Sequence, residues 1–333
     1  MSQIQDRKKD HINIVLNKDV EPNDSSFTKY RLPYKSFPEI DFEKIDTTVD
    51  LFDKKLSFPF IISSMTGGEK LGTVINKNIA IAAEKAGVAF GLGSMRVILR
   101  KPESLKTFNV RKDCPTIPMY ANFGVVQLNY GYGADDINKI IDLVEADGIF
   151  LHVNPIQEII QPEGDKNWEG LLLKLSKIIP KIKGNVILKE TGHGIDFASA
   201  KKLAEMGVKW IDVSGSGGTS WANVEAYRRI DDIGHLFKAE GIPTDELLKS
   251  HSKIKGLNLI AGGGIRNGKD VAKSIALGAK IATAAKPLLA DALKSDEKVF
   301  ETLQKLKTEL KIAMFITGAK NLNELSKIKL TEA

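Results

Sequence analysis

The stretch LIAGGGIRNG at residues 259–268 passes from a short apolar run through three glycines into a helix-like segment. The same order of apolar run, glycine-rich or polar loop and helix-like segment recurs along the chain. The runs are bounded by turn residues and are too short for buried helices. There are eight of them, at 60–63, 88–92, 118–122, 148–152, 185–189, 209–213, 258–261 and 280–284. This rhythm predicts an α/β fold, the (β/α)8 TIM barrel, with its chemistry at one rim.

The first 58 residues do not follow the alternation of strands and helices. They begin with a polar, helix-like stretch and continue with prolines and strand-like runs. Because α/β barrels of this length fold as one unit, the 333 residues do not require a second full domain. We expect an N-terminal extension over residues 1–58 that caps a barrel over residues 59–333. Helices are expected at 76–86, 134–146, 168–179, 196–206, 222–239, 269–277 and 296–317.

Composition indicates a soluble, cytoplasmic protein that binds a small anion. Hydrophobic residues make up 42% of the chain and charged residues 27%, and no apolar run is long enough to span a membrane. The N-terminus has no apolar signal segment. The 48 basic and 42 acidic residues are interspersed, which speaks against nucleic acid as the partner. The single cysteine, Cys114, has no partner for a disulfide and no neighbours at metal-ligand spacing.

Two glycine-rich loops follow neighbouring strands. At 262–264, backbone N–H groups and the start of the next helix are suited to a phosphate, and barrels commonly bind phosphate after strands seven and eight. Ala285 and Lys286 form the adjacent rim, and the loop at 214–219 adds hydroxyls and amides. The pair predicts a phosphorylated cofactor. A glycine turn without a ligand is the alternative.

Lys189 ends the fifth run, and strand alternation places it on the same side as Ile187, toward the barrel axis. A buried ammonium needs an electron-rich partner, because an unpaired buried charge is costly. The N1–C2=O edge of a reduced flavin is such a partner. Alternatively, the lysine extends to solvent or pairs with Glu190.

Polar residues gather after the fourth run, where His152 and Asn154 share one strand face and Gln157 and Glu158 enter the next loop. A carboxylate such as that of Glu158 suits Mg²⁺, which completes its shell with water and substrate phosphate. Alternatively, His152 is a core residue without a functional role and Glu158 is a surface carboxylate. At the N-terminus, three basic side chains would share one helix face and clamp an anion, or simply remain solvated: Arg7, Lys8 and His11.

Taken in order, these motifs resemble the type 2 isopentenyl-diphosphate isomerases, FMN-dependent barrel enzymes of isoprenoid biosynthesis. The resemblance covers nearly the whole chain. It rests on the Arg-Lys-x-x-His motif at 7–11 and on the segments at 65–68, 93–96, 152–158, 161–165, 215–221 and 263–268.

The resemblance implies three sets of site residues. The FMN set is Met65, Thr66, Gly67, Ser94, Asn122, Lys189, Ser214, Thr219, Gly263, Gly264, Arg266, Ala285 and Lys286. The substrate set is Arg7, Lys8, His11, Ser94, Arg96, His152, Asn154 and Gln157. The catalytic set is Gln157, His152 and Lys189, with Glu158 as the ligand of a Mg²⁺ ion that bridges to the diphosphate.

The resemblance further implies interconversion of isopentenyl and dimethylallyl diphosphate, with reduced FMN as acid and base, NADPH as the reductant, and a homotetramer or homo-octamer. Three details depart from the family pattern: Gly262 stands where serine is common, His193 lies in a glycine turn of variable sequence, and Lys286 stands where an apolar residue is usual. Two other readings stay open. One is an FMN-dependent 2-hydroxy acid oxidase, for which no His–Arg pair is found near the later strands. The other is a non-catalytic barrel that binds a phosphorylated ligand.

Overall fold

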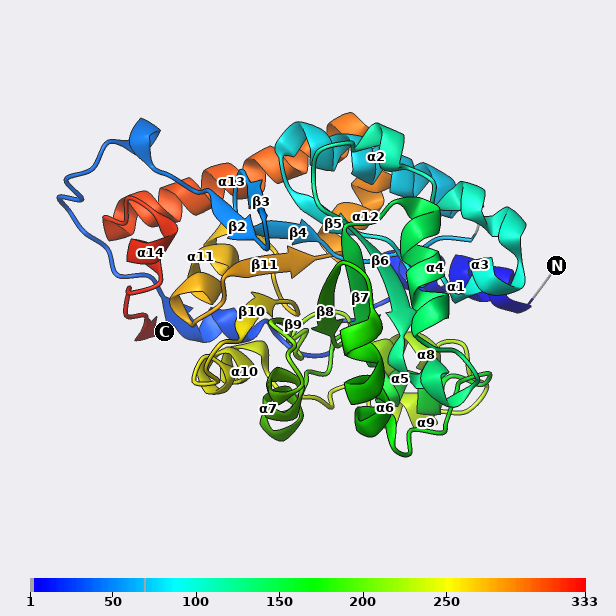
Figure 1. Cartoon of the computed structure of the whole chain (residues 1–333). Helices are drawn as coiled ribbons and strands as arrows, with labels where there is room; N and C mark the ends of the chain where they lie inside the picture. Colours follow the sequence, from blue (N-terminus) through cyan, green and yellow to red (C-terminus); the bar gives the residue numbers. More distant parts are fainter. Residues whose placement is uncertain (1–2, 69) are drawn as a thin grey trace.

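The computed structural model describes residues 3–68 and 70–333. Eight parallel strands close into a barrel in the order β10-β11-β4-β5-β6-β7-β8-β9 (Figure 1). Each of the eight predicted runs overlaps one of them, so the predicted (β/α)8 TIM barrel is confirmed. The strands are β4 (Phe60–Ile62), β5 (Ala89–Gly91), β6 (Met119–Gly124), β7 (Gly148–His152), β8 (Asn185–Lys189), β9 (Trp210–Asp212), β10 (Asn258–Ala261) and β11 (Ile281–Ala284).

Helices surround the barrel (Figure 1), and buried apolar side chains of the larger ones belong to the same hydrophobic core as the strands. The larger ones are α2 (Lys70–Ala86), α4 (Ala134–Val144), α6 (Leu171–Ile178), α7 (Phe197–Glu205), α10 (Thr244–His251), α11 (Gly268–Ala276), α12 (Lys286–Ala292) and α13 (Asp296–Thr317). The shorter ones are α3 (Arg96–Arg100), α5 (Pro155–Ile160), α8 (Trp221–Ala226), α9 (Ile233–Leu236) and α14 (Leu322–Leu325). No helix within 3–68 and 70–333 is long and apolar enough to cross a membrane.

The helix expected over 222–239 is interrupted between α8 and α9. Asp231 accepts the backbone N–H of Ile233 at 3.3 Å and also pairs with Arg229. Short acidic side chains that bond to nearby backbone compete with helix continuation. The prediction of one long helix here was wrong for that reason.

Two layers of side chains fill the barrel, one apolar and one largely polar. The apolar layer takes one residue from each strand: Ile61, Ala89, Tyr120, Phe150, Ile187, Trp210, Ile260 and Ile281. Because strand side chains alternate, the residue two positions further along each strand or just past its end also points inward. Those residues are Ser63, Gly91, Asn122, His152, Lys189, Asp212, Gly262 and Thr283. The change from apolar to polar occurs toward the carboxyl ends of the strands.

The N-terminal extension closes the base of the barrel, at the amino ends of the strands. The hairpin of β2 (Val49–Leu51) and β3 (Lys54–Leu56) adds Leu51 and Leu56 to the apolar layer. The Phe52 ring lies 5.7 Å from the ring of Trp210, and Lys54 Nζ lies 2.6 Å from the carboxylate of Asp147. Side chains of this hairpin therefore pack into the base of the barrel.

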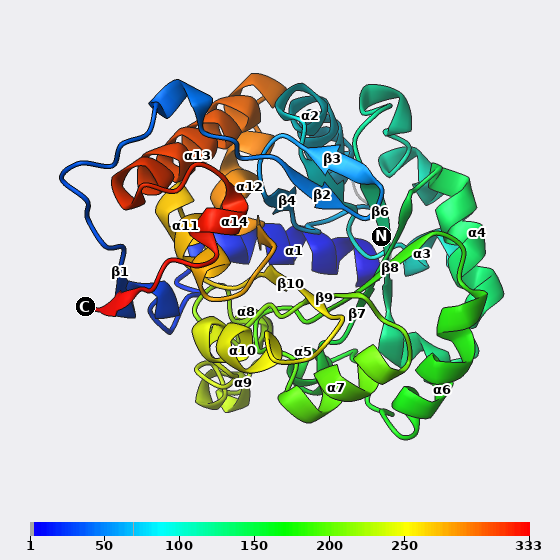
Figure 2. The same cartoon turned by 60° about the vertical axis from the view of Figure 1, so that its left-hand side comes forward.

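The same extension covers the mouth of the barrel. Helix α1 (Gln3–Asn17) packs against α8 and α12 and buries Ile12 and Val15 (Figure 2). Further along, β1 (Tyr30–Arg31) pairs with β12 (Thr331–Glu332), so the extension also meets the last residues of the chain. Residues before the barrel thus line both of its ends.

Candidate active site

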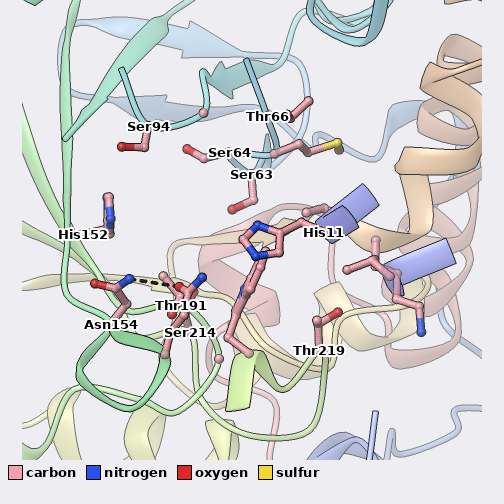
Figure 3. A pocket seen from close by; sticks show the side chains of 18 of the residues that line it. His11, Ser63, Ser64, Thr66, Ser94, His152, Asn154, Thr191, Ser214 and Thr219 are labelled. Carbon is pink, nitrogen blue, oxygen red and sulfur yellow. Dashed lines mark hydrogen bonds between the residues drawn. The ribbon is translucent and has the colours of Figure 1, made fainter. Parts of the chain in front are cut away.

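A cavity of about 280 Å³ lies at the barrel mouth, between the carboxyl ends of the strands and α1. Figure 3 shows His11 of α1 facing Ser63, Ser64 and Thr66 of the β4 loop, with His152 and Asn154 along another wall. The cavity gathers almost every site residue expected from the sequence: Arg7, Lys8, His11, Met65, Thr66, Ser94, Arg96, Asn122, His152, Asn154, Gln157, Glu158, Lys189, Ser214, Thr219, Gly263, Gly264, Arg266, Ala285 and Lys286.

Gly67 is the expected residue that does not line the cavity. A Cβ atom built on it would lie 2.0 Å from Cε1 of the buried Phe108 ring. Its carbonyl accepts a hydrogen bond from Lys8 Nζ. The observed contacts of Gly67 are therefore with Phe108 and with α1, rather than with the cavity.

The two glycine-rich loops pack directly on each other. Gly263 has φ +89°, and a Cβ on it would lie 2.0 Å from the Gly215 carbonyl. Gly264 has φ +81°, and its N–H lies beside Gly218. In the described part of the chain, the N–H groups of Gly264 and Ile265 donate no hydrogen bond, although both residues line the cavity. Such unpaired, convergent donors suit a phosphate.

The start of α11 does not supply the donors that the sequence predicted. Asn267 Oδ1 accepts the N–H of Asp270 at 2.9 Å, and Glu309 accepts the N–H of Gly268 at 2.7 Å. The N–H of Arg266 is bonded to the Asp270 carboxylate at 3.1 Å. Because the chain caps its own helix here, the unpaired N–H donors described at the cavity wall belong to the loop.

Two cations stand beside this loop. Arg266 Nη2 lies 3.1 Å from Glu21 Oε2, and Lys286 Nζ lies 3.5 Å from Glu21 Oε1. Glu21 belongs to the extension and lines the same cavity. We name Arg266, Lys286 and the loop 262–265 the cradle.

Lys189 is buried at the carboxyl end of β8, and its Nζ donates to the backbone carbonyl of Glu190 at 2.6 Å. The carboxylate of Glu190 instead accepts the N–H groups of residues 191–194. Burial raises the pKa of Glu190 to about 7 despite those bonds. Burial also raises the pKa of Asp212, and the charge of Lys189 partly offsets that rise. Lys189 thus lines the cavity, and its described hydrogen bond goes to a backbone carbonyl rather than to a carboxylate.

His152 is held in one orientation by the neighbouring strand. Its Nδ1 lies 2.8 Å from Asn122 Oδ1, while Asn122 Nδ2 donates to Ser64 Oγ at 2.8 Å. Because the amide oxygen accepts, the proton of the ring is assigned to Nδ1. Burial, with the nearby charges of Lys189 and Arg96, lowers the pKa of His152 to about 3. The imidazole is therefore neutral at pH 7.

Helix α1 brings its basic face to the other side of the cavity. Lys8 Nζ is bonded to the Gly67 carbonyl and lies 3.4 Å from the Ser94 carbonyl. Burial lowers the pKa of Arg7, although Glu163 at 3.8 Å acts in the opposite direction. The partly buried cations of α1 favour an anionic ligand between them and the barrel.

Arg96 is positioned by a three-residue network. Its Nη1 pairs with the carboxylate of Asp165 and donates to Gln127 Oε1, while Gln127 Nε2 donates to Asp165 at 2.7 Å. Arg96 therefore has a fixed direction at the cavity wall.

Glu158 carries the buried carboxylate expected for a metal. One oxygen accepts Asn154 Nδ2 at 3.1 Å and the other the N–H of Asp165 at 2.8 Å. Burial raises the pKa of Glu158, an effect that these hydrogen bonds and Arg7 reduce. Within residues 3–68 and 70–333, no three metal-ligating side chains come together. A Mg²⁺ ion at Glu158 would therefore need water and ligand oxygens, as Mg²⁺ commonly does.

Sequence reasoning missed Glu225, a fully buried carboxylate on α8. It accepts Gln157 Nε2 at 3.0 Å and lies 2.8 Å from His11 Nε2 and 2.6 Å from Arg228 Nη1. Burial alone would raise the pKa of Glu225, but these hydrogen bonds hold it below its usual range. Since Gln157 Oε1 accepts from Asn154 at 2.9 Å, both ends of that amide are oriented. The sequence signal that could have identified Glu225 is an acidic residue placed within an apolar helical segment.

The cavity wall carries the polar groups that a phosphorylated, hydrogen-bonding ligand requires. Thr66 Oγ1 is buried at the wall and has no hydrogen-bond partner in the described structure. Buried polar atoms are normally paired, so such an atom points to a missing partner. The Thr66 hydroxyl, the cradle and the inward Lys189 are the groups expected around a flavin mononucleotide: a polar partner for the ring or sugar chain, a phosphate site and a buried cation.

Curated relatives match the chain along almost its full length. A Rickettsia bellii (strain RML369-C) protein named isopentenyl-diphosphate delta-isomerase is 44% identical over 330 residues, covering 97% of this chain and 96% of that protein. Proteins of the same name from Nostoc sp. (strain PCC 7120 / SAG 25.82 / UTEX 2576) and Synechocystis sp. (strain ATCC 27184 / PCC 6803 / Kazusa) are 44% and 42% identical. Each of these two covers 97% of this chain and is itself covered over 95% of its length.

A family model described as FMN-dependent dehydrogenase matches residues 152–332. Among solved structures, a lactate oxidase of Pediococcus acidilactici superposes with a TM-score of 0.68 at 16% identity, over 92% of this chain and 84% of that chain. A mandelate oxidase structure with (S)-mandelic acid gives 0.65 at 15% identity over 98% of both. At these identities the structures establish the shared fold.

Proposed function

We propose that this chain, which belongs to the isopentenyl-diphosphate delta-isomerase family, interconverts isopentenyl and dimethylallyl diphosphate with the help of bound reduced FMN. The observation that carries the proposal is the division of one cavity into two anion sites. The cradle lies on one side, and the cations of α1 with Glu158 lie on the other. A flavin phosphate and a substrate diphosphate call for such a pair.

On the cofactor side, the cradle would hold the phosphate through the N–H groups of Gly264 and Ile265. Thr66, Ser94, Asn122, Ser214 and Thr219 would bond polar atoms of the sugar chain and ring, with Met65 packing beside them. The buried ammonium of Lys189 would face an electron-rich edge of the ring. When bound, reduced FMN supplies an electron-rich surface and groups that give and take protons.

On the substrate side, Arg7, Lys8, His11 and Arg96 would bind the diphosphate. Glu158 would bind Mg²⁺, whose remaining ligands come from diphosphate and water. Neutral His152 donates or accepts hydrogen bonds without adding a charge. With the diphosphate bound by these groups, the hydrocarbon part of the substrate would lie toward the barrel axis, with α1 over it.

The reaction adds one proton to the terminal methylene carbon and removes one from C2, so no net oxidation occurs. Protonation places positive charge on the tertiary carbon, and a water-free site with fixed dipoles stabilises it. Gln157 is held between Glu225 and Asn154 and would orient the reacting groups. The ionised Glu225 keeps the amide nitrogen of Gln157 pointing toward itself.

Several finer predictions accompany this proposal. NADPH would reduce the cofactor, the protein would be cytoplasmic, and the assembly would be a homotetramer or homo-octamer. Residues 1–58 would act as a cap on an FMN-binding barrel over 59–333. The N-terminal basic residues support that division because they line the cavity.

The test is an anaerobic assay of the purified protein with isopentenyl diphosphate, FMN, Mg²⁺ and NADPH. We expect dimethylallyl diphosphate to form, with no product when FMN is omitted from flavin-free protein. Lactate and mandelate serve as alternative substrates under oxygen. Oxidation of either acid without turnover of the diphosphate would refute the proposal in favour of an oxidase. Flavin binding with neither reaction would favour a ligand-binding barrel.

A further inference from the structure

Glu21 occupies the position between the two cations of the cradle. Its two carboxylate oxygens lie 3.1 Å from Arg266 Nη2 and 3.5 Å from Lys286 Nζ. The three side chains are 25%, 35% and 32% exposed, so each is partly shielded from water. A carboxylate from the N-terminal extension thus satisfies the charges that the proposed function assigns to a phosphate.

The segment around Glu21 is attached to the loop 262–265 and to the start of α8. The Val20 carbonyl accepts the N–H of Ser220 at 2.8 Å, and Ser25 Oγ donates to the Gly264 carbonyl at 2.7 Å. The Asp19 carbonyl accepts Asn223 Nδ2 at 2.8 Å. These bonds do not involve the carboxylate of Glu21. The segment 19–25 therefore remains fixed whether or not Glu21 keeps its cations.

We propose that Glu21 sets the affinity of the cradle for phosphate by competing with it for Arg266 and Lys286. The inference rests on the proposed function, because it takes the cradle as the phosphate end of the FMN site. A phosphate monoester carries up to two negative charges and three acceptor oxygens. Its approach places it beside the Glu21 carboxylate, and like charges at this range repel each other. Phosphate binding at Arg266 and Lys286 therefore competes with the double ion pair of Glu21.

This competition predicts selectivity that depends on the phosphate and not on the flavin ring. Riboflavin has the same ring but no phosphate, so Glu21 opposes FMN binding and leaves riboflavin binding unaffected. Glu21→Gln keeps the size of the side chain and removes its charge. We expect this variant to bind FMN about tenfold more tightly, the size of one partly screened charge interaction, with riboflavin affinity unchanged.

The experiment titrates flavin-free protein with FMN and with riboflavin, following the quenching of flavin fluorescence. Glu205→Gln is the matched control, because it removes one negative charge at the exposed end of α7, away from the cradle. Its FMN affinity should equal that of the wild-type protein. Circular dichroism melting checks that each variant is folded. Glu21→Asp, with a side chain too short to reach both cations, should give an intermediate gain if Glu21→Gln does not fold.

A double-mutant cycle with Lys286→Met sharpens the test. With one of the two cations removed, there is less to compete for, so the gain from Glu21→Gln should shrink to about threefold or less. Equal gains in both backgrounds would refute competition for Lys286. Unchanged or weaker FMN affinity in Glu21→Gln, or an equal gain for riboflavin, would overturn the inference while leaving the proposed function intact. Failure of the wild-type protein to bind FMN at all would refute both.

Discussion

The two layers inside the barrel differ in chemistry although they lie only two residues apart along each strand. The lower layer is apolar on all eight strands and is sealed by Leu51 and Leu56 from the extension. The upper layer contains Asn122, His152 and Lys189 and opens into the cavity. The comparison teaches that the lower layer of side chains stabilises the barrel, while the upper layer forms the binding site. Substitutions in the two layers should therefore affect different measurements.

Gln157→Ala should have the largest effect, and it acts at the mouth. Removing the amide oriented by Glu225 and Asn154 should lower kcat for isomerisation by about 10³-fold, within the range of losses for groups that assist proton transfer. FMN affinity should stay at the wild-type value. Steady-state assays of flavin-loaded protein measure the rate. An unchanged kcat would remove Gln157 from the mechanism.

Leu56→Ala breaks the seal at the base. Leu56 is 1% exposed and belongs to the apolar layer, so its truncation should lower the free energy of unfolding by about 2–5 kcal/mol. Urea denaturation measures this loss. At 25 °C the folded variant should keep the wild-type kcat and FMN affinity. A large drop in kcat at full folding would show that the two layers are coupled.

Lys189→Met removes a charge from the upper layer while nearly keeping its volume. If the ammonium faces the flavin, FMN affinity should fall by about 30-fold, the value of one hydrogen bond to a charged group. Riboflavin affinity should fall by the same factor, because the contact is with the ring. Fluorescence titration with both flavins measures the two affinities. Equal FMN affinity in variant and wild type contradicts the buried-charge argument.

His193, in the loop that follows β8, should make the free energy of unfolding sensitive to acid. Burial lowers the pKa of His193 to about 4, so the unfolded chain, with a histidine pKa near 6.5, binds the proton first as pH falls. The folded protein thus loses part of its stability as pH falls from about 6.5 to 4. At pH 5, this loss should amount to about 2 kcal/mol. In His193→Gln, urea denaturation at pH 7 and pH 5 should show a smaller difference by that amount. Equal pH dependence would rule out this contribution.

Tyr120→Phe should have the smallest effect, and it acts in the apolar layer. Tyr120 Oη is buried and has no hydrogen-bond partner in the described part of the chain. Removing a hydroxyl that has lost its water should stabilise the protein by about 1 kcal/mol. Thermal melting detects the change. Destabilisation would mean that an internal water satisfies the hydroxyl.

The sequence allowed the barrel and most cavity residues to be predicted, because both depend on local patterns. Short apolar runs followed by glycines mark strand ends, and parallel strands bring those ends to one rim. Glu21 and Glu225 lie in no such pattern. Their roles arise from contacts with Lys286 and Gln157, far away along the chain, which no local period encodes.

The caps of α11 and the break before α9 were missed for a related reason. Asn267, Asp270 and Glu309 could each have faced solvent, and their sequence neighbours do not distinguish solvent from a helix terminus. Asp231 similarly stops a segment whose apolar spacing alone favours a continuous helix. Side-chain bonds to backbone compete with regular structure in ways that periodicity does not measure.

The extension that covers both ends of the barrel has a consequence for how the chain folds. It is synthesised before the barrel, yet its binding surfaces are built from strands that come later in the chain, up to β11. Its pairing with β12 also needs Thr331 and Glu332. The extension therefore completes its contacts only after these distant segments have been made. Covering the barrel at both ends is a late, long-range step in folding.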